Sequence, residues 1–149
     1  MFEPRNERFA ERVRASFERQ NFMHTIGAQV TAVEPGFVEI RLAYAPALCQ
    51  QHGFFHGGVI GTLADNAAGY AAFSLMSEHD SVLTVEYKMN FVAPGRGEAL
   101  VARGQVLRPG RTLTVCEAKV YARGGNDERL CATALCTMMT LAEQADAPR

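Results

Sequence analysis

One carboxylate stands alone in the most apolar segment of this chain. Between His56 and Glu78, Asp65 is the only charged residue, and most of its neighbours are Ala, Gly, Leu, Ile, Val or Phe. A helix that is apolar around its circumference belongs in a protein interior. A carboxylate there loses solvation, so it must be hydrogen-bonded, shifted in pKa or used in chemistry. Asp65 is therefore a candidate general base or nucleophile; the alternative is a carboxylate bonded only to a hydroxyl or a backbone amide.

A second candidate site lies where the same segment begins, at His56-Gly57-Gly58. Glycines at a helix start let a ligand approach the backbone, and the first N–H groups of a helix have no partner inside it. With the helix dipole, these groups can polarise a carbonyl oxygen or bind an anion. Gly57 is thus a candidate donor, although two glycines can also simply permit a tight turn. His56 could act as a base, as a donor or as a structural brace of that turn.

The spacing of Asp65 and Gly57 restricts how they could act together. Eight helical residues advance about 12 Å, which an aspartate side chain cannot span to reach an atom held at the Gly57 N–H. If both act on one substrate, they must come from two subunits with antiparallel helices across a two-fold axis. The apolar circumference supports the same conclusion, because a single sheet covers only one side of a helix. We therefore expect an obligate homodimer.

Other polar residues could serve such a site. Thr84 lies on the predicted polar face of its strand and could orient a carboxylate or a water, although most strand threonines do neither. Gln50 and His52, which precede the helix, offer donors near Gly57. Arginines that cluster at predicted strand ends could grip phosphates or could be ordinary surface residues; they are Arg108, Arg111 and Arg123.

The composition restricts the class of protein. The 149 residues are 48% hydrophobic and 21% charged, which predicts one globular domain, residues 1–149, with a substantial core. A net charge of −1 argues against a nucleic-acid partner. The N-terminus has no apolar signal segment, and the apolar stretch at 57–77 is too rich in Gly and Ala for a membrane span. We expect a cytoplasmic protein without a membrane partner.

The cysteines predict buried, reduced thiols. They show neither CxxC spacing nor a neighbouring histidine cluster, so zinc ligation and disulfides are the weaker interpretations. The four are Cys49, Cys116, Cys131 and Cys136.

The hydrophobic periodicity predicts a helix, two strands, a long buried helix and four strands. An amphipathic helix over 4–20 occupies the N-terminal segment 1–20. A hairpin of strands 26–33 and 37–44 turns at Pro35-Gly36, and the buried helix spans 57–77. Alternation puts Leu83, Val85, Tyr87, Met89 and Phe91 on one face of the next strand and Val82, Thr84, Glu86, Lys88 and Asn90 on the other. Strands at 98–107, 112–122 and 130–141 follow, and residues 143–149 form a flexible tail. This is an α+β chain whose antiparallel sheet packs on the long helix.

These residues, taken together, resemble the hotdog-fold acyl-CoA thioesterases, most closely the PaaI-type (phenylacetate-degradation) family. The resemblance runs from residue 22 to about residue 141, and its most specific part is HGGVIGTLAD at 56–65. TVEYKMNFVAPGRGE at 84–98 and GRTLTVCEAKVY at 110–121 support it. It implies an antiparallel sheet of five to six strands wrapped around the helix, subunits paired edge to edge, and active sites between subunits. Two such dimers commonly form a homotetramer in this family.

The resemblance also implies a role for each candidate residue. The Gly57 N–H polarises the thioester carbonyl, and Asp65 of the partner subunit activates water or attacks directly. Thr84 stands where the family often has a Ser or Thr that positions the water, and Gln50 stands where many members have Asn. The substrate is an acyl-CoA, whose phosphates suit the surface arginines. No metal or separate cofactor is implied, because coenzyme A is part of the substrate.

Two alternatives stay open. A hotdog hydratase or dehydratase would pair a catalytic His56 with an acidic residue, and a non-catalytic acyl-CoA-binding protein could share the fold. The acyl group is also open, because an apolar, adaptable pocket suits aryl-acetyl and medium-chain groups equally well. Methionines and aromatic side chains predict such a pocket; the aromatic ones are Phe54, Phe55, Tyr70 and Phe73.

Overall fold

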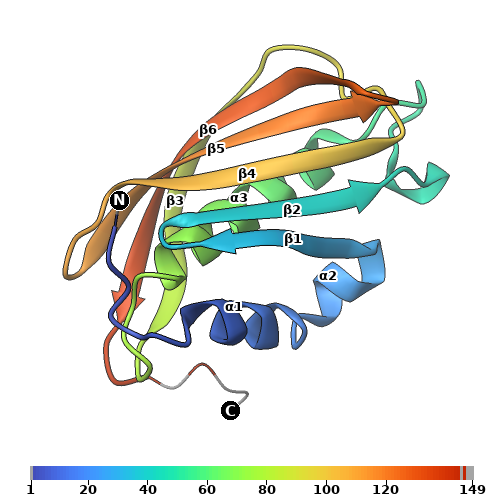
Figure 1. Cartoon of the computed structure of the whole chain (residues 1–149). Helices are drawn as coiled ribbons and strands as arrows, with labels where there is room; N and C mark the ends of the chain where they lie inside the picture. Colours follow the sequence, from blue (N-terminus) through green and yellow to red (C-terminus); the bar gives the residue numbers. More distant parts are fainter. Residues whose placement is uncertain (1, 145, 147–149) are drawn as a thin grey trace.

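The alternating and helical patterns fold into a curved sheet around one long helix (Figure 1). The computed structural model describes residues 2–144 and 146. The helices are α1 (Phe9–Phe17), α2 (Asn21–Ile26), the short 3-10 helix η1 (Pro46–Leu48) and α3 (Gly57–Phe73). The strands are β1 (Ala28–Glu34), β2 (Phe37–Ala43), β3 (Ser81–Phe91), β4 (Ala99–Arg108), β5 (Leu113–Gly124) and β6 (Asp127–Leu141). The predicted α+β hotdog architecture is confirmed.

The six strands form one antiparallel sheet in the order β1-β2-β4-β5-β6-β3. Its concave face wraps α3, whereas α1 and α2 run alongside β1 (Figure 1). The helix backbone lies directly against Gly104 of β4, where a Cβ atom would be 2.2 Å from the backbone of Ala67. A glycine is therefore required there, because any side chain would overlap the helix backbone.

The N-terminal helix is shorter than predicted and is followed by a second one. Gln20 has an extended backbone that separates α1 from α2, and α2 ends at Gly27, whose φ of 79° is left-handed. The central helix ends at Phe73, four residues before the predicted end. Ser74 ties this end to the β1–β2 turn, because its hydroxyl accepts from the Gly36 N–H at 2.8 Å and donates to the Ala71 carbonyl at 2.7 Å.

The central helix is not apolar all round, which corrects one expectation. After its first turn, α3 buries every residue except four that follow one another on one face. They are Thr62, Asp65, Asn66 and Gly69. This stripe of polar and small side chains is the part of the helix left for a ligand or another subunit.

A β-bulge reverses the two faces of β3. The pairing of β3 with β6 shifts between Thr84 and Glu86, so Val85 is the extra residue. Thr84 therefore faces α3 at the start of the strand, whereas Tyr87 and Phe91 face the helix after the bulge and lie against Gly61 and Gly57. The prediction that Thr84 shares a face with Glu86, Lys88 and Asn90 is wrong, because strict alternation does not allow for the inserted residue.

β3 forms an uncovered edge of the sheet and carries several exposed apolar side chains. β3 is an edge strand of the sheet, and the side chains of Leu83, Val85 and Phe91 are 54%, 53% and 57% exposed. An exposed apolar edge is a ready surface for pairing with another strand.

Candidate functional site

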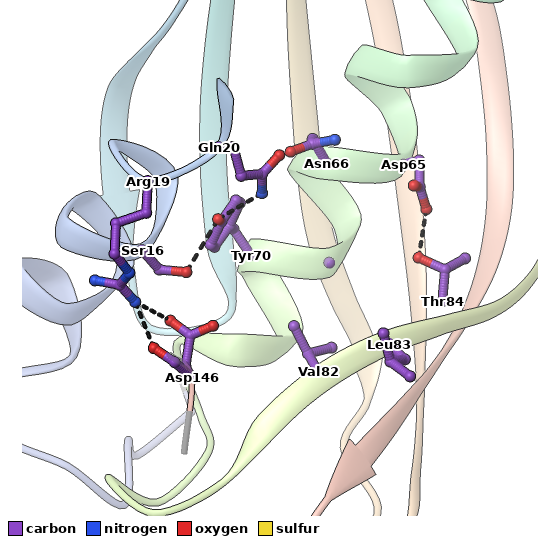
Figure 2. Close-up of a pocket in the computed structure, with 11 residues that line it drawn as sticks. Ser16, Arg19, Gln20, Asp65, Asn66, Tyr70, Val82, Leu83, Thr84 and Asp146 are labelled. Carbon is purple, nitrogen blue, oxygen red and sulfur yellow. Dashed lines mark hydrogen bonds and ion pairs between the residues drawn. The ribbon is translucent and has the colours of Figure 1, made fainter. Parts of the chain in front are cut away.

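Asp65 lies on the uncovered stripe of α3 beside the start of β3. The Thr84 hydroxyl donates a hydrogen bond of 2.7 Å to Oδ1 of Asp65 (Figure 2). Burial raises the pKa of the Asp65 carboxyl, and the Thr84 bond opposes that rise by stabilising the charged form. A half-buried carboxylate with a raised pKa is a stronger base than a solvated one. The sequence predicted that Thr84 could orient a carboxylate, and the structure shows that it bonds Asp65.

A cavity of about 390 Å³ opens beside this carboxylate; we call it the Asp65 cavity. Asp65 and Thr84 line one part of it, and Gln20 and Tyr70 line another (Figure 2). The Tyr70 hydroxyl lies 2.6 Å from Nε2 of Gln20 and 3.1 Å from Oγ of Ser16. The cavity is thus bounded by the helix, the edge strand and the N-terminal segment together.

Gly57 forms the first position of α3 and belongs to a different environment. Its N–H has no partner inside the helix, and no acceptor takes it within the described part of the chain. The next N–H, of Gly58, is capped by Nδ1 of His56 at 2.9 Å. The Gly57 N–H is therefore the free donor of this helix end, and the helix dipole adds to its pull on a carbonyl oxygen.

His56 acts as the N-cap of α3. Because Nδ1 accepts from Gly58, its neutral ring carries the proton on Nε2 and presents a donor to solvent. A ring in this tautomer offers no free basic nitrogen, which disfavours the alternative of a hydratase with His56 as general base. The bond supports the interpretation of His56 as a structural brace.

Gln50 lies with Gly57 in a second cavity, of about 480 Å³, which we call the Gly57 cavity. The Gln50 carbonyl oxygen accepts from the backbone N–H of His52, so its amide NH₂ is the end left to donate. Phe91 closes one side, because its ring lies 3.4 Å from the position of a Cβ on Gly57. Two donors therefore border this cavity.

The two cavities share no lining residue. Asp65 and Thr84 line one, and Gly57 and Gln50 line the other. The candidate base and the candidate N–H donor of one chain thus lie at different places along α3. This separation agrees with the advance of about 12 Å that eight helical residues make between Gly57 and Asp65.

The three predicted arginines do not form one cluster. Arg123 lies opposite Ala99 at the start of β4, whereas Arg108 lies opposite Val115 at the far end of the same strand. Arg111 follows in the turn beyond Arg108. Of the three, Arg123 is at the end of the sheet near the Gly57 cavity, since its carbonyl accepts from Glu98 N–H in the loop after that cavity's lining residues. The sequence suggested one cluster because all three arginines border turns, but these turns lie at opposite ends of the sheet.

The predicted apolar acyl pocket is also divided. Phe54 and Phe55 line the Gly57 cavity, and Phe73 is buried in the core. Tyr70 alone of these four lines the Asp65 cavity, where its hydroxyl is hydrogen-bonded. Ser16 and Gln20 were not predicted as cavity residues, because Ser16 reaches the cavity from α1 and Gln20 from the segment between α1 and α2. The one feature of the sequence that could have indicated a polar cavity was Asn66, a second polar residue next to Asp65.

None of the four cysteines, all of which the structure describes, lines either cavity, although Cys136 lies near enough to Asp65 for the carboxylate to add to the rise in pKa that burial causes. Cys116, Cys131 and Cys136 are buried free thiols and Cys49 is partly buried. Burial raises the pKa of Cys116 and Cys136 to about 12, which makes them poor nucleophiles. Across residues 2–144 and 146, no three His, Cys, Asp or Glu side chains converge as metal ligands. No helix in these same residues is both long and apolar enough to cross a bilayer.

Comparison with known proteins places this chain in a family. The thioesterase superfamily profile matches residues 52–129, which include the Gly57 and Asp65 positions. A crystal structure of a thioesterase family protein from Silicibacter pomeroyi is 50% identical, with a TM-score of 0.88 over 90% of this chain and 98% of that one. The 1,4-dihydroxy-2-naphthoyl-CoA hydrolase of Listeria monocytogenes is 27% identical over 114 residues, 76% of this chain and 90% of its own.

The Escherichia coli PaaI protein from the phenylacetic acid degradation operon shares the fold, with a TM-score of 0.83 at 19% identity over 93% of this chain and 96% of its own. The predicted resemblance is therefore confirmed at the level of fold and superfamily. The matched profile covers more than half of the chain, and the chain belongs to the thioesterase superfamily of thioester hydrolases.

Proposed function

We propose that this protein is an acyl-CoA thioesterase whose active site is completed by a second copy of the chain. One observation carries the proposal: the two half-sites lie at opposite ends of the same unpaired edge strand. Thr84, at the start of β3, bonds Asp65, and Phe91, at the end of β3, contacts the Gly57 position. Seven residues of strand separate Thr84 from Phe91, or about 23 Å.

Antiparallel pairing of two β3 edges joins these ends. In such a pair, the start of one strand lies beside the end of the other. Asp65 and Thr84 of one subunit then approach the partner's Gly57, and the two-fold axis creates two such sites. The exposed apolar side chains of Leu83, Val85 and Phe91 would be buried in the same step. Homodimerisation thus supplies both the missing half-site and the missing cover.

The chemistry follows from the groups that meet. The thioester carbonyl oxygen accepts from the Gly57 N–H and the Gln50 NH₂, which stabilise the oxyanion. The Asp65 carboxylate takes a proton from water while that water attacks the carbonyl carbon. Collapse of the tetrahedral intermediate breaks the C–S bond, and the proton held by Asp65 passes to the leaving thiolate. Direct attack by Asp65, through an anhydride that water then hydrolyses, uses the same geometry.

Coenzyme A as the thiol is supported by the relatives, one of which is named for a CoA thioester. Its phosphates would lie near Arg123, at the Gly57 end of the sheet. Apolar side chains on the outer surface of the sheet give a further interface for a dimer of dimers. They are Leu107, Leu113 and Leu135.

Mixed dimers test the shared site directly. Asp65→Asn removes the base, and Gly57→Pro removes the N–H donor; each variant alone should be inactive on an acyl-CoA. In co-expressed mixtures, a heterodimer of the two has one site with both lesions and one fully native site. Random 1:1 assembly therefore restores about one quarter of wild-type activity. A site built within one subunit would show no recovery, and an active monomer would refute the proposal.

A further inference from the structure

The far part of the Asp65 cavity is polar, although an acyl pocket is expected to be apolar. Ser16, Gln20 and Tyr70 form a hydrogen-bonded group there, and the ion pair of Arg19 with Asp146 also lines the cavity (Figure 2). The contacts of 2.6 Å and 3.1 Å within the hydrogen-bonded group centre on the Tyr70 hydroxyl. An alkyl chain in this part of the cavity would offer these polar groups no hydrogen bond, whereas a polar group on the ligand could add one.

Asn66 adds an unpartnered acceptor to the same cavity. Its Nδ2 donates to the Thr62 carbonyl at 3.3 Å, which directs Oδ1 away from the helix backbone. Oδ1 is buried and has no hydrogen-bond partner within the described residues. In Figure 2 it points toward the Gln20 amide. A buried acceptor of this kind lowers the stability of the free protein and can recover that loss by binding a donor.

The Gln20 amide leaves a second acceptor in this part of the cavity. Its Nε2 donates to the Tyr70 hydroxyl, so its Oε1, like Oδ1 of Asn66, is available to accept a hydrogen bond from a ligand. A ligand hydroxyl can donate to such an acceptor and can itself accept from a neighbouring donor. We propose that this polar end selects acyl groups that carry a hydroxyl at a distance from the thioester, with Asn66, Tyr70 and Gln20 as the specificity-determining residues.

The position of the polar end sets the length of the preferred acyl group. Five helical residues separate Asp65 from Tyr70, an advance of about 7.5 Å. This is the length of an extended six-carbon acyl chain ending in a hydroxyl. Asn66 and Gly69 lie between them and line the same cavity, so the Asn66 amide borders the path and Gly69 adds no side chain to it. The inference rests on the proposed function, since it takes Asp65 as the group beside the thioester carbon.

Matched substrate pairs test the inference. We would measure kcat/KM for acyl-CoAs of four, six and eight carbons, each with and without a terminal hydroxyl, by release of free CoA thiol. The wild-type protein should prefer the hydroxylated member about 3- to 10-fold for each hydrogen bond formed. The preference should be largest at six carbons. Hydrolysis of all pairs without any preference would overturn the inference and leave the thioesterase proposal intact; hydrolysis of no acyl-CoA would overturn both.

Two variants separate recognition from a structural role. Tyr70→Phe keeps the ring, which packs against Phe17 and Phe73 with centroids 5.8 and 5.9 Å away, and removes only the hydroxyl. Asn66→Leu removes the unpartnered acceptor. Both should raise KM for ω-hydroxyhexanoyl-CoA more than KM for hexanoyl-CoA, so that the preference for the hydroxylated substrate is abolished. Tyr121→Phe, on β5 outside the cavity, is the control that should leave the preference unchanged. Equal losses on both substrates, with a lowered Tm, would show a structural brace and refute the inference.

Discussion

Gly57→Pro isolates the backbone donor that the proposed mechanism requires. Proline is well tolerated at the first position of a helix, because that N–H has no partner inside the helix. His56, which precedes it, has an extended backbone with ψ of 139°, as a residue before proline needs. A Cβ at position 57 would lie 3.4 Å from the Phe91 ring, which is ordinary contact. The variant should therefore fold and lack only the donor.

The expected loss is large and can be attributed to one atom. Removing one oxyanion donor from a preorganised site costs about 10²- to 10³-fold in kcat, or about 2.7–4 kcal/mol. Gly57→Ala is the matched control, because it adds the same Cβ but keeps the N–H; its kcat should stay within a few-fold of wild type. Both would be assayed by CoA thiol release, with Tm recorded for each. If Gly57→Pro stayed within tenfold of Gly57→Ala, the oxyanion assignment would be wrong, and if both were equally impaired, the Cβ would be responsible.

Four more outcomes follow from the geometry. Thr84→Ala should raise the Asp65 pKa and move the acid limb of the kcat/KM profile to higher pH, whereas Thr84→Ser should not; an unmoved limb would exclude Asp65 as the titrating base. Asp65→Asn should unfold at a higher temperature than wild type at neutral pH, because burial raises the Asp65 pKa and the ionised form costs stability above that pKa. The two curves should converge as the pH falls through that pKa. His56→Ala should lose about 1 kcal/mol of unfolding free energy with its cap, recovered in His56→Ser, and keep most thioesterase activity. Gly104→Ala should lose more than about 3 kcal/mol or fail to fold, whereas Gly124→Ala, with open space around it, should be nearly neutral in chemical denaturation.

Much of this fold could be predicted because its elements have strong local signals. Pro35-Gly36 turns where expected, with Gly36 at a φ of 76°, and the long alternating strands lie close to their predicted bounds. α2 was not predicted because a segment of six residues is too short to show a helical period that can be told from a strand pattern. The end of α3 was misplaced because Ser74, which ties it to a turn, acts through tertiary contacts that the sequence does not display.

The part of the candidate site that lies on α3 could be predicted from the sequence. Asp65 and Gly57 were identified from their positions on one helix, and the length of that helix implied that they do not meet within a chain. The contribution of Gln20 was not predictable, because it depends on how α1 and α2 fold back against α3. Such packing is decided by contacts distant in sequence, which periodicity alone does not report.

The bulge at Val85 explains how a single strand can contribute to both half-sites. Thr84 and Phe91 are an odd number of residues apart, so in a regular strand one would face α3 and the other would face away. One inserted residue between them turns both toward the helix, where Thr84 binds Asp65 and Phe91 bounds the Gly57 cavity. A strand without the bulge could support only one half-site, and two paired strands would then complete neither active site. The insertion is thus as necessary to the proposed shared site as the residues that perform the chemistry.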